Sequence, residues 1–209
     1  MASNLTEQKI HQALEWAFEK AMDGVPGTGT AKEFAEQYLR DNDTPWDAAN
    51  SLIRWQNTKA GTSGFLTGLG GLVTLPVTIP ANVASVLYVQ LRMITAIAYL
   101  GDYDPRDDKV KTFVFACLAG NAVKDLLKDA GIAISQKVAL SAINKISGAT
   151  LIKINQMVGF RLLTKFGTTG VINLGKAVPL LGGIVGGAFD SITTNTVGNA
   201  ARDMFIARG

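Results

Sequence analysis

Cysteine and histidine are almost absent from this chain of 209 residues, which has one of each, Cys117 and His11. No disulfide can form within the chain, and a metal site or a catalytic dyad built from these residue types would need this single pair. Cys117 lies in the apolar run FVFACLAG, where a cysteine is usually a small core residue, and His11 lies on a polar helix. We therefore predict no metal site, no cofactor and no catalytic residue of these types.

A secretory signal is also missing. The first residues, MASNLTEQKIHQ, are polar and lack the basic stretch and apolar core of a signal peptide. Together with the lack of disulfides, this favours an intracellular location.

Charge is scarce and unevenly distributed. Charged residues make up 18% of the chain, against about 25% in an average protein. Residues 60–91 carry no charge, and residues 130–189 contain no acidic residue. The net charge is −4 over residues 1–104 and +7 over residues 105–209. A basic, apolar and acid-free stretch suits an anionic surface such as lipid headgroups or nucleic acid.

Period-two alternation is absent too, so we expect no strands. Capping boxes begin at Asn4 and Thr30, and Thr44 and Asp104 each precede a proline that starts a helix. The predicted helices span 5–23, 31–41, 45–60, 81–101, 105–130, 133–147, 149–167 and 184–207. The sequence predicts an all-α fold, a compact multi-helix bundle in one domain over 1–209, with amphipathic helices of residues 1–44 packed on or beside the core.

The stretch 64–90, GFLTGLGGLVTLPVTIPANVASVLYVQ, is long enough to cross a bilayer. Its glycines and prolines instead predict a glycine-rich hairpin over 61–80 followed by one apolar helix. That helix carries a single charge, Arg92, and the apolar segment 178–206 carries Asp190. We expect the two segments to form a buried helical pair joined by an Arg92–Asp190 ion pair, because an unpaired buried charge is costly.

Other polar residues of these apolar helices are predicted to lie in the core, namely Asn82, Gln90 and Asn195. In an alternative interpretation, Arg92, Asp190, Asn82 and Gln90 line a pocket of a hydrolase-like enzyme that acts on an apolar or lipid substrate. The usual catalytic motifs are missing, since there is no P-loop lysine, GxSxG elbow or HExxH pair. GLGG is more typical of close helix packing.

A series of basic residues recurs within the acid-free stretch, separated by apolar segments such as QMVGFRLLTKF. This composition is typical of interfacial helices, whose apolar face lies in lipid while the cations reach phosphate. A solvated face of a helical bundle is the alternative. The predicted anionic-surface residues are Lys137, Lys145, Lys153, Arg161, Lys165 and Lys176.

Two segments resemble the EcsC family of bacterial proteins, GFLTGLGGLVTLPVTIPANVASVLYVQLRMITAIAYLGDYDP and KAVPLLGGIVGGAFDSITTNTVGNAARDMF. The resemblance covers roughly residues 45–207. It implies a helical fold with suspected membrane association, in a family whose founding member is encoded beside an ABC transporter. Relatives often carry an acid where this chain has Asn82, which argues against a charge relay there.

From these features we expect a non-enzymatic, cytoplasmic protein at the inner face of the cytoplasmic membrane. Its partners would be anionic lipid or a membrane protein such as a transporter. Nucleic acid is disfavoured, because no DNA-binding helix pattern or aromatic-interleaved basic surface is evident. The alternatives are the enzyme described above and an oligomerising pore or immunity-type protein.

Overall fold

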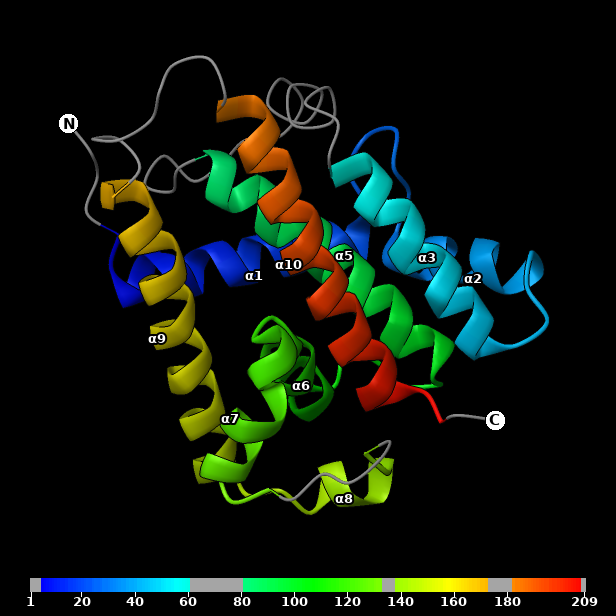
Figure 1. Cartoon of the computed structure of the whole chain (residues 1–209). Coiled ribbons are helices and arrows are strands. Elements are labelled where there is room, and N and C mark those ends of the chain that lie inside the picture. Colours follow the sequence, from blue (N-terminus) through cyan, green and yellow to red (C-terminus); the bar gives the residue numbers. More distant parts are fainter. Residues whose placement is uncertain (1–4, 61–80, 133–137, 173–181, 208–209) are drawn as a thin grey trace.

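The computed structural model describes residues 5–60, 81–132, 138–172 and 182–207, and within these ranges all side chains except those of 57–60, 81–82, 167–172 and 182–193 (Figure 1). The helices are α1 (Glu7–Asp23), α2 (Ala31–Arg40), α3 (Pro45–Ala60), α5 (Ala81–Leu100), α6 (Asp108–Cys117), the 3₁₀ helix η1 (Gly120–Ala122), α7 (Val123–Asp129), α8 (Leu140–Asn144), α9 (Gly148–Ile172) and α10 (Gly182–Phe205). Over these ranges the chain has no sheet, only an isolated bridge between Val25 and Gly29. The predicted all-α fold is confirmed.

Helix starts follow from local capping. Thr30 and Glu33 form the predicted capping box, in which each side chain accepts a hydrogen bond from the other residue's backbone N–H. The side chain of Thr44 accepts from the backbone N–H of Asp47 at 3.1 Å at the start of α3. The predicted start at Asp104 and Pro105 was wrong, since the Asp107 carboxylate caps α6 and the helix begins at Asp108. These caps satisfy N–H groups that have no partner inside the helix.

One long helix predicted over 105–130 is instead divided into α6, η1 and α7. The division occurs at Gly120, whose φ of +57° lies in the left-handed region that favours glycine. A Cβ atom at this position would lie 3.0 Å from Thr196 Oγ1 of α10, so the turn lets the chain approach α10 closely. The helix predicted over 133–147 is also too long, since among its described residues only Leu140–Asn144 are helical.

The core is built around α5, which packs against α1, α2, α3, α6 and α10 and lies at the centre of the molecule (Figure 1). Its segment Val83–Leu100 is long and apolar enough to cross a membrane, with a mean hydropathy of 1.6, but 89% of that segment is buried in the protein. An apolar helix covered by other helices on every side is typical of a protein core. The N-terminal helix α1 belongs to this core through side chains such as Ile10 and Leu14.

Helices α5 and α10 lie side by side, as predicted (Figure 1). Glycines permit the close approach at two levels. A Cβ on Gly198 would lie 3.1 Å from Met93 Sδ, and a Cβ on Gly101 would lie 2.2 Å from the carbonyl oxygen of Phe205. The pairing of Met93 with Gly198 and of Gly101 with Phe205 means that the two helices run parallel.

Candidate functional site

Arg92 lies on α5 with a side chain that is 5% exposed. Its guanidinium stacks over the Phe34 ring of α2, 3.9 Å from the ring centroid, and donates to the carbonyl oxygen of Thr28. The Thr28 hydroxyl in turn shares a hydrogen bond of 2.9 Å with the Tyr88 hydroxyl of α5. Arg92 and Tyr88 therefore attach α2 and the turn before it to the central helix.

Burial is the dominant influence on this guanidinium, and it lowers the Arg92 pKa from its ordinary value, while Tyr88, Tyr38 and Glu33 oppose that change. No described residue accepts a hydrogen bond from the Arg92 Nε atom. The predicted partner, Asp190, lies on α10, but its side chain is outside the described residues. The Arg92–Asp190 ion pair therefore stays a prediction, and the contacts that the structure gives to Arg92 are with Phe34 and Thr28.

The remaining residues of the predicted polar core have different positions. Gln90 is fully buried on α5, and neither its amide nitrogen nor its amide oxygen has a partner among the described residues. Asn195 is exposed on α10, so its assignment to the polar core was wrong. The side chain of Asn82 lies outside the described residues. Neither of the two cavities described below is lined by Arg92 or Gln90.

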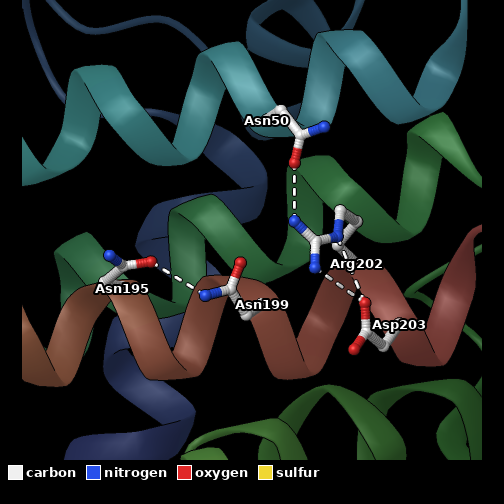
Figure 2. A network of polar contacts seen from close by, with 5 residues as sticks. All are labelled: Asn50, Asn195, Asn199, Arg202 and Asp203. Atoms are coloured by element: carbon white, nitrogen blue, oxygen red, sulfur yellow. Dashed lines mark hydrogen bonds and ion pairs between the residues drawn. The ribbon is translucent and has the colours of Figure 1, made fainter.

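A polar seam joins α3 to α10 (Figure 2). Arg202 donates to the Asn50 side-chain oxygen at 2.6 Å, forms an ion pair with Asp203 at 2.9 Å, and stacks 4.3 Å from the centroid of the Trp46 ring. Asn199 donates to the side-chain oxygen of Asn195 at 2.9 Å. Only the contacts of Arg202 with Asn50 and Trp46 cross between the two helices, since the other two lie within α10. A cavity of about 280 Å³ beside them is lined by Asp47, Asn50, Ile53, Arg54, Asn195 and Asn199.

Helix α9 presents a face that combines large apolar and cationic side chains. Phe160 and Ile152 are 68% and 60% exposed, and Lys153 and Arg161, which follow them directly in the chain, are exposed as well. The opposite face is buried through Ile154, Val158 and Leu162, which recur every four residues. Nothing acidic lies anywhere on this helix.

The predicted anionic-surface residues are therefore only partly brought together. Lys153, Arg161 and Lys165 lie on α9, with Lys165 half-buried and its Nζ atom 5.4 Å from the centroid of the Phe166 ring. Lys153 donates to the backbone carbonyl of Asp129, and Lys145 is exposed in the turn after α8. Lys137 and Lys176 lie outside the described residues.

A cleft of about 1,250 Å³ lies beside α9, between this helix, the segment from Leu118 through α7, and α10. Sequence reasoning missed this cleft because its walls come from segments that are far apart in the chain. Its apolar lining includes side chains that are almost fully buried, Leu118, Leu126, Leu162 and Val197. Phe160 also lines it, so the cleft opens beside the exposed face of α9.

Charges of opposite sign line the two helical walls of this cleft. Asp125 and Asp129 lie one turn apart on α7, and Arg161 and Lys165 lie one turn apart on α9. No described residue pairs with the side-chain charge of Asp125, Asp129 or Arg161. Glu7 of α1 contributes one further acid to the lining. The arrangement offers an apolar floor with acceptors on one side and donors on the other.

The lone cysteine and histidine do not form a site. Cys117 is fully buried in α6, and this burial raises the pKa of its thiol well above the ordinary value. His11 lies on α1 with Nε2 4.0 Å from a carboxylate oxygen of Glu7. Within the described ranges, no three His, Cys, Asp or Glu side chains are placed to hold a metal ion together.

These observations define an all-helical protein with a covered apolar centre and a basic amphipathic helix at its surface. The chain belongs to the EcsC protein family, whose family model matches residues 1–209. The match confirms the resemblance seen over residues 45–207 and extends it to the N-terminal helices. No curated protein and no solved structure is similar enough to this chain to match it.

Proposed function

We propose that this protein binds the anionic surface of a membrane through α9 and stays folded while it does so. The observation that carries the proposal is the exposed face of α9, where Phe160 and Ile152 project beside Lys153 and Arg161. Apolar side chains on such a face enter the boundary between headgroups and acyl chains, and the neighbouring cations reach phosphate. The cytoplasmic leaflet is the expected target because its surface potential is negative.

The absence of acid on α9 supports an anionic target. A solvated helix of a soluble bundle usually mixes both signs of charge on its outer face, which lowers its net field. Here, Lys153 and Arg161 face no acid on their own helix, and the acids nearest to them, Asp125, Asp129 and Glu7, lie on other helices in the lining of the cleft. Large apolar side chains beside them add the burial energy that charge alone does not supply.

The central helix α5 is not needed for this binding. It is the segment that could cross a membrane by length and composition, yet its side chains are already covered by the neighbouring helices α1, α2, α3, α6 and α10. Withdrawing it would expose apolar core that α1, α3 and α10 now bury, and Arg92 would lose its contacts with Phe34 and Thr28. We therefore propose peripheral binding without insertion of the core.

Co-sedimentation with vesicles tests the proposal. The purified chain is mixed at low salt with vesicles of phosphatidylglycerol or of phosphatidylcholine, and the bound fraction is measured against lipid concentration. Each cation near an anionic surface contributes about 1 kcal/mol, so Lys153→Gln with Arg161→Gln should weaken binding to phosphatidylglycerol about 30-fold. Phe160→Ser should weaken it by about 10-fold, because much of a phenylalanine side chain no longer enters the interface.

Matched variants on α2 provide the control. Lys32→Gln with Arg40→Gln removes two exposed cations, and Leu39→Ser removes an apolar side chain that is 44% exposed. These changes should leave vesicle binding within twofold of the wild type. Equal losses from the α2 and α9 variants would show that binding is a general effect of charge, and no binding of the wild type to either vesicle would refute the proposal.

A further inference from the structure

The cleft beside α9 has the composition of a binding site for an amphiphile. Its volume of about 1,250 Å³ is at or above the range of roughly 300–1,000 Å³ that small-molecule sites occupy. Leu126, Leu162 and Val197 contribute to an apolar floor, and their side chains are 5%, 1% and 1% exposed. A floor of this kind suits a hydrocarbon chain, since burying apolar surface is favourable in proportion to its area.

The charged walls specify which amphiphile fits. Arg161 and Lys165 on α9 can donate to a phosphate, and an Arg guanidinium does so with a fixed fork of N–H groups. Asp125 and Asp129 on α7 can attract an ammonium group through their negative charge. Glu7 adds a third acid, so the charged lining has no excess of positive charge that would favour a purely anionic headgroup.

We propose that this cleft binds a zwitterionic phospholipid, with an acyl chain on the apolar floor. Its phosphate lies against Arg161 and Lys165, and its cationic ammonium group lies against Asp125 and Asp129. A fatty acid or an anionic lipid would satisfy only the α9 wall and would place its charge near uncompensated carboxylates. A peptide helix is a less good occupant, because the two walls recognise one phosphate and one amine and not a repeating backbone.

This inference does not rest on membrane binding by α9. Phe160 and Arg161 belong both to the outer face, which attracts an anionic surface, and to the lining of the cleft, which recognises a single lipid molecule. The two can be separated with a lysophospholipid at concentrations below those at which it forms micelles, because no membrane surface is then present. Failure of vesicle binding would leave the cleft proposal standing, and failure of lysolipid binding would leave the α9 proposal standing.

Isothermal titration calorimetry with monomeric lysophosphatidylcholine is the direct experiment, compared with monomeric lysophosphatidylglycerol and with a fatty acid of the same chain length. The wild type should bind one equivalent of lysophosphatidylcholine, and more tightly than either anionic amphiphile. Removing both acids with Asp125→Asn and Asp129→Asn should weaken the binding of lysophosphatidylcholine by about 3- to 10-fold. The same variant should bind lysophosphatidylglycerol more tightly than the wild type does.

Two further variants separate the cleft from general effects. Lys124→Gln with Lys128→Gln changes α7 residues that do not line the cleft, and it should leave both affinities unchanged within twofold. Met157→Trp fills part of the cleft and should weaken the binding of every amphiphile at least tenfold. Circular dichroism verifies that the fold of this variant persists. The proposal is overturned if lysophosphatidylcholine does not bind, if the anionic amphiphiles bind as tightly as it does, or if the α7 acid variant keeps the wild-type preference.

Discussion

Replacing Arg92 with methionine should destabilise the protein even though it removes a buried charge. The wild-type guanidinium gains a desolvated cation–π contact with Phe34, of about 2 kcal/mol, and a charge-assisted hydrogen bond to the Thr28 carbonyl, of about 1.5–3 kcal/mol. Against these stands the cost of burying a cation, which also lowers the Arg92 pKa. Methionine keeps most of the apolar stem but leaves the Thr28 carbonyl without its donor.

We expect a net loss of about 2 kcal/mol, because the contacts and the burial cost oppose each other. For a protein of this length, each kcal/mol lowers the melting temperature by about 2–4 °C, so the expected decrease is about 6 °C. Thermal unfolding followed by circular dichroism measures it, with urea unfolding as a check on the free energy. Arg92→Lys should lose less stability than Arg92→Met, since lysine keeps the positive charge and loses only the planar stack on Phe34.

A variant as stable as the wild type, or more stable, would refute this reasoning, because it would mean that the burial cost equals the contact energy. The same experiment tests the predicted ion pair. If Arg92 pairs with Asp190, then Arg92→Met and Asp190→Asn should be non-additive by more than about 0.5 kcal/mol in a double-mutant cycle. If the losses in the free energy of unfolding are additive, Arg92 does not pair with Asp190, and Phe34 and Thr28 are the partners that stabilise it.

Two further predictions concern the core. Gly101→Ala should lower the free energy of unfolding by about 1–3 kcal/mol, because the new Cβ would lie 2.2 Å from the Phe205 carbonyl oxygen. The control is Gly148→Ala, whose new Cβ would meet nothing within 4 Å and should have no such cost in urea titrations. Equal stabilities of the two variants would contradict the α5–α10 packing. The Cys117 thiol should resist a thiol reagent at pH 8 in the native protein and react in denaturant, because burial raises its pKa and keeps it protonated. Since the unfolded thiol has a pKa of about 8.5, the free energy of unfolding should fall above that pH, and Cys117→Ala should make this fall smaller. Rapid reaction of the native thiol would contradict its burial.

Much of the helical architecture was predictable because its signals are local. The Thr30 capping box and the Thr44 cap before Pro45 are short patterns whose hydrogen bonds form within one helical turn. The apolar character of residues 81–100 likewise predicts a buried helix without reference to the rest of the chain. These features are correct in the structure because tertiary contacts reinforce the local preferences.

The interruption at Gly120 was not predictable in the same way. The segment from 105 to 130 contains apolar residues at helical spacing and no internal proline, so the local signals favour one helix. The left-handed turn at Gly120 is explained by its close approach to Thr196 of α10, which is a contact between distant parts of the chain. A sequence pattern contains no information on that approach.

In the candidate site too, the features that depend on local sequence were predictable, and those that depend on contacts between distant segments were not. The basic and apolar character of α9 was visible in the sequence, but the exposure of Phe160 and Ile152 together was not, since either could have packed into the core. Arg92 was expected to need a partner, yet nothing in the sequence identifies the Phe34 ring or the Thr28 carbonyl as that partner. The cleft combines walls from α7, α9 and α10, whose juxtaposition follows only from the fold.

The central claim is that the outer face of α9 contacts the membrane, and a fluorophore placed on that face tests it most directly. Gln156 is exposed midway between Ile152 and Phe160, so Gln156→Cys offers a labelling position that keeps both apolar side chains. The buried Cys117 should not compete for the label. Leu39→Cys on α2 is the matched control.

An environment-sensitive dye at residue 156 should shift its emission to shorter wavelength when phosphatidylglycerol vesicles are added, because it enters the interfacial region. The dye at residue 39 should keep its emission in water. No shift at residue 156 in the presence of vesicles that bind the protein, or an equal shift at both positions, would contradict the account.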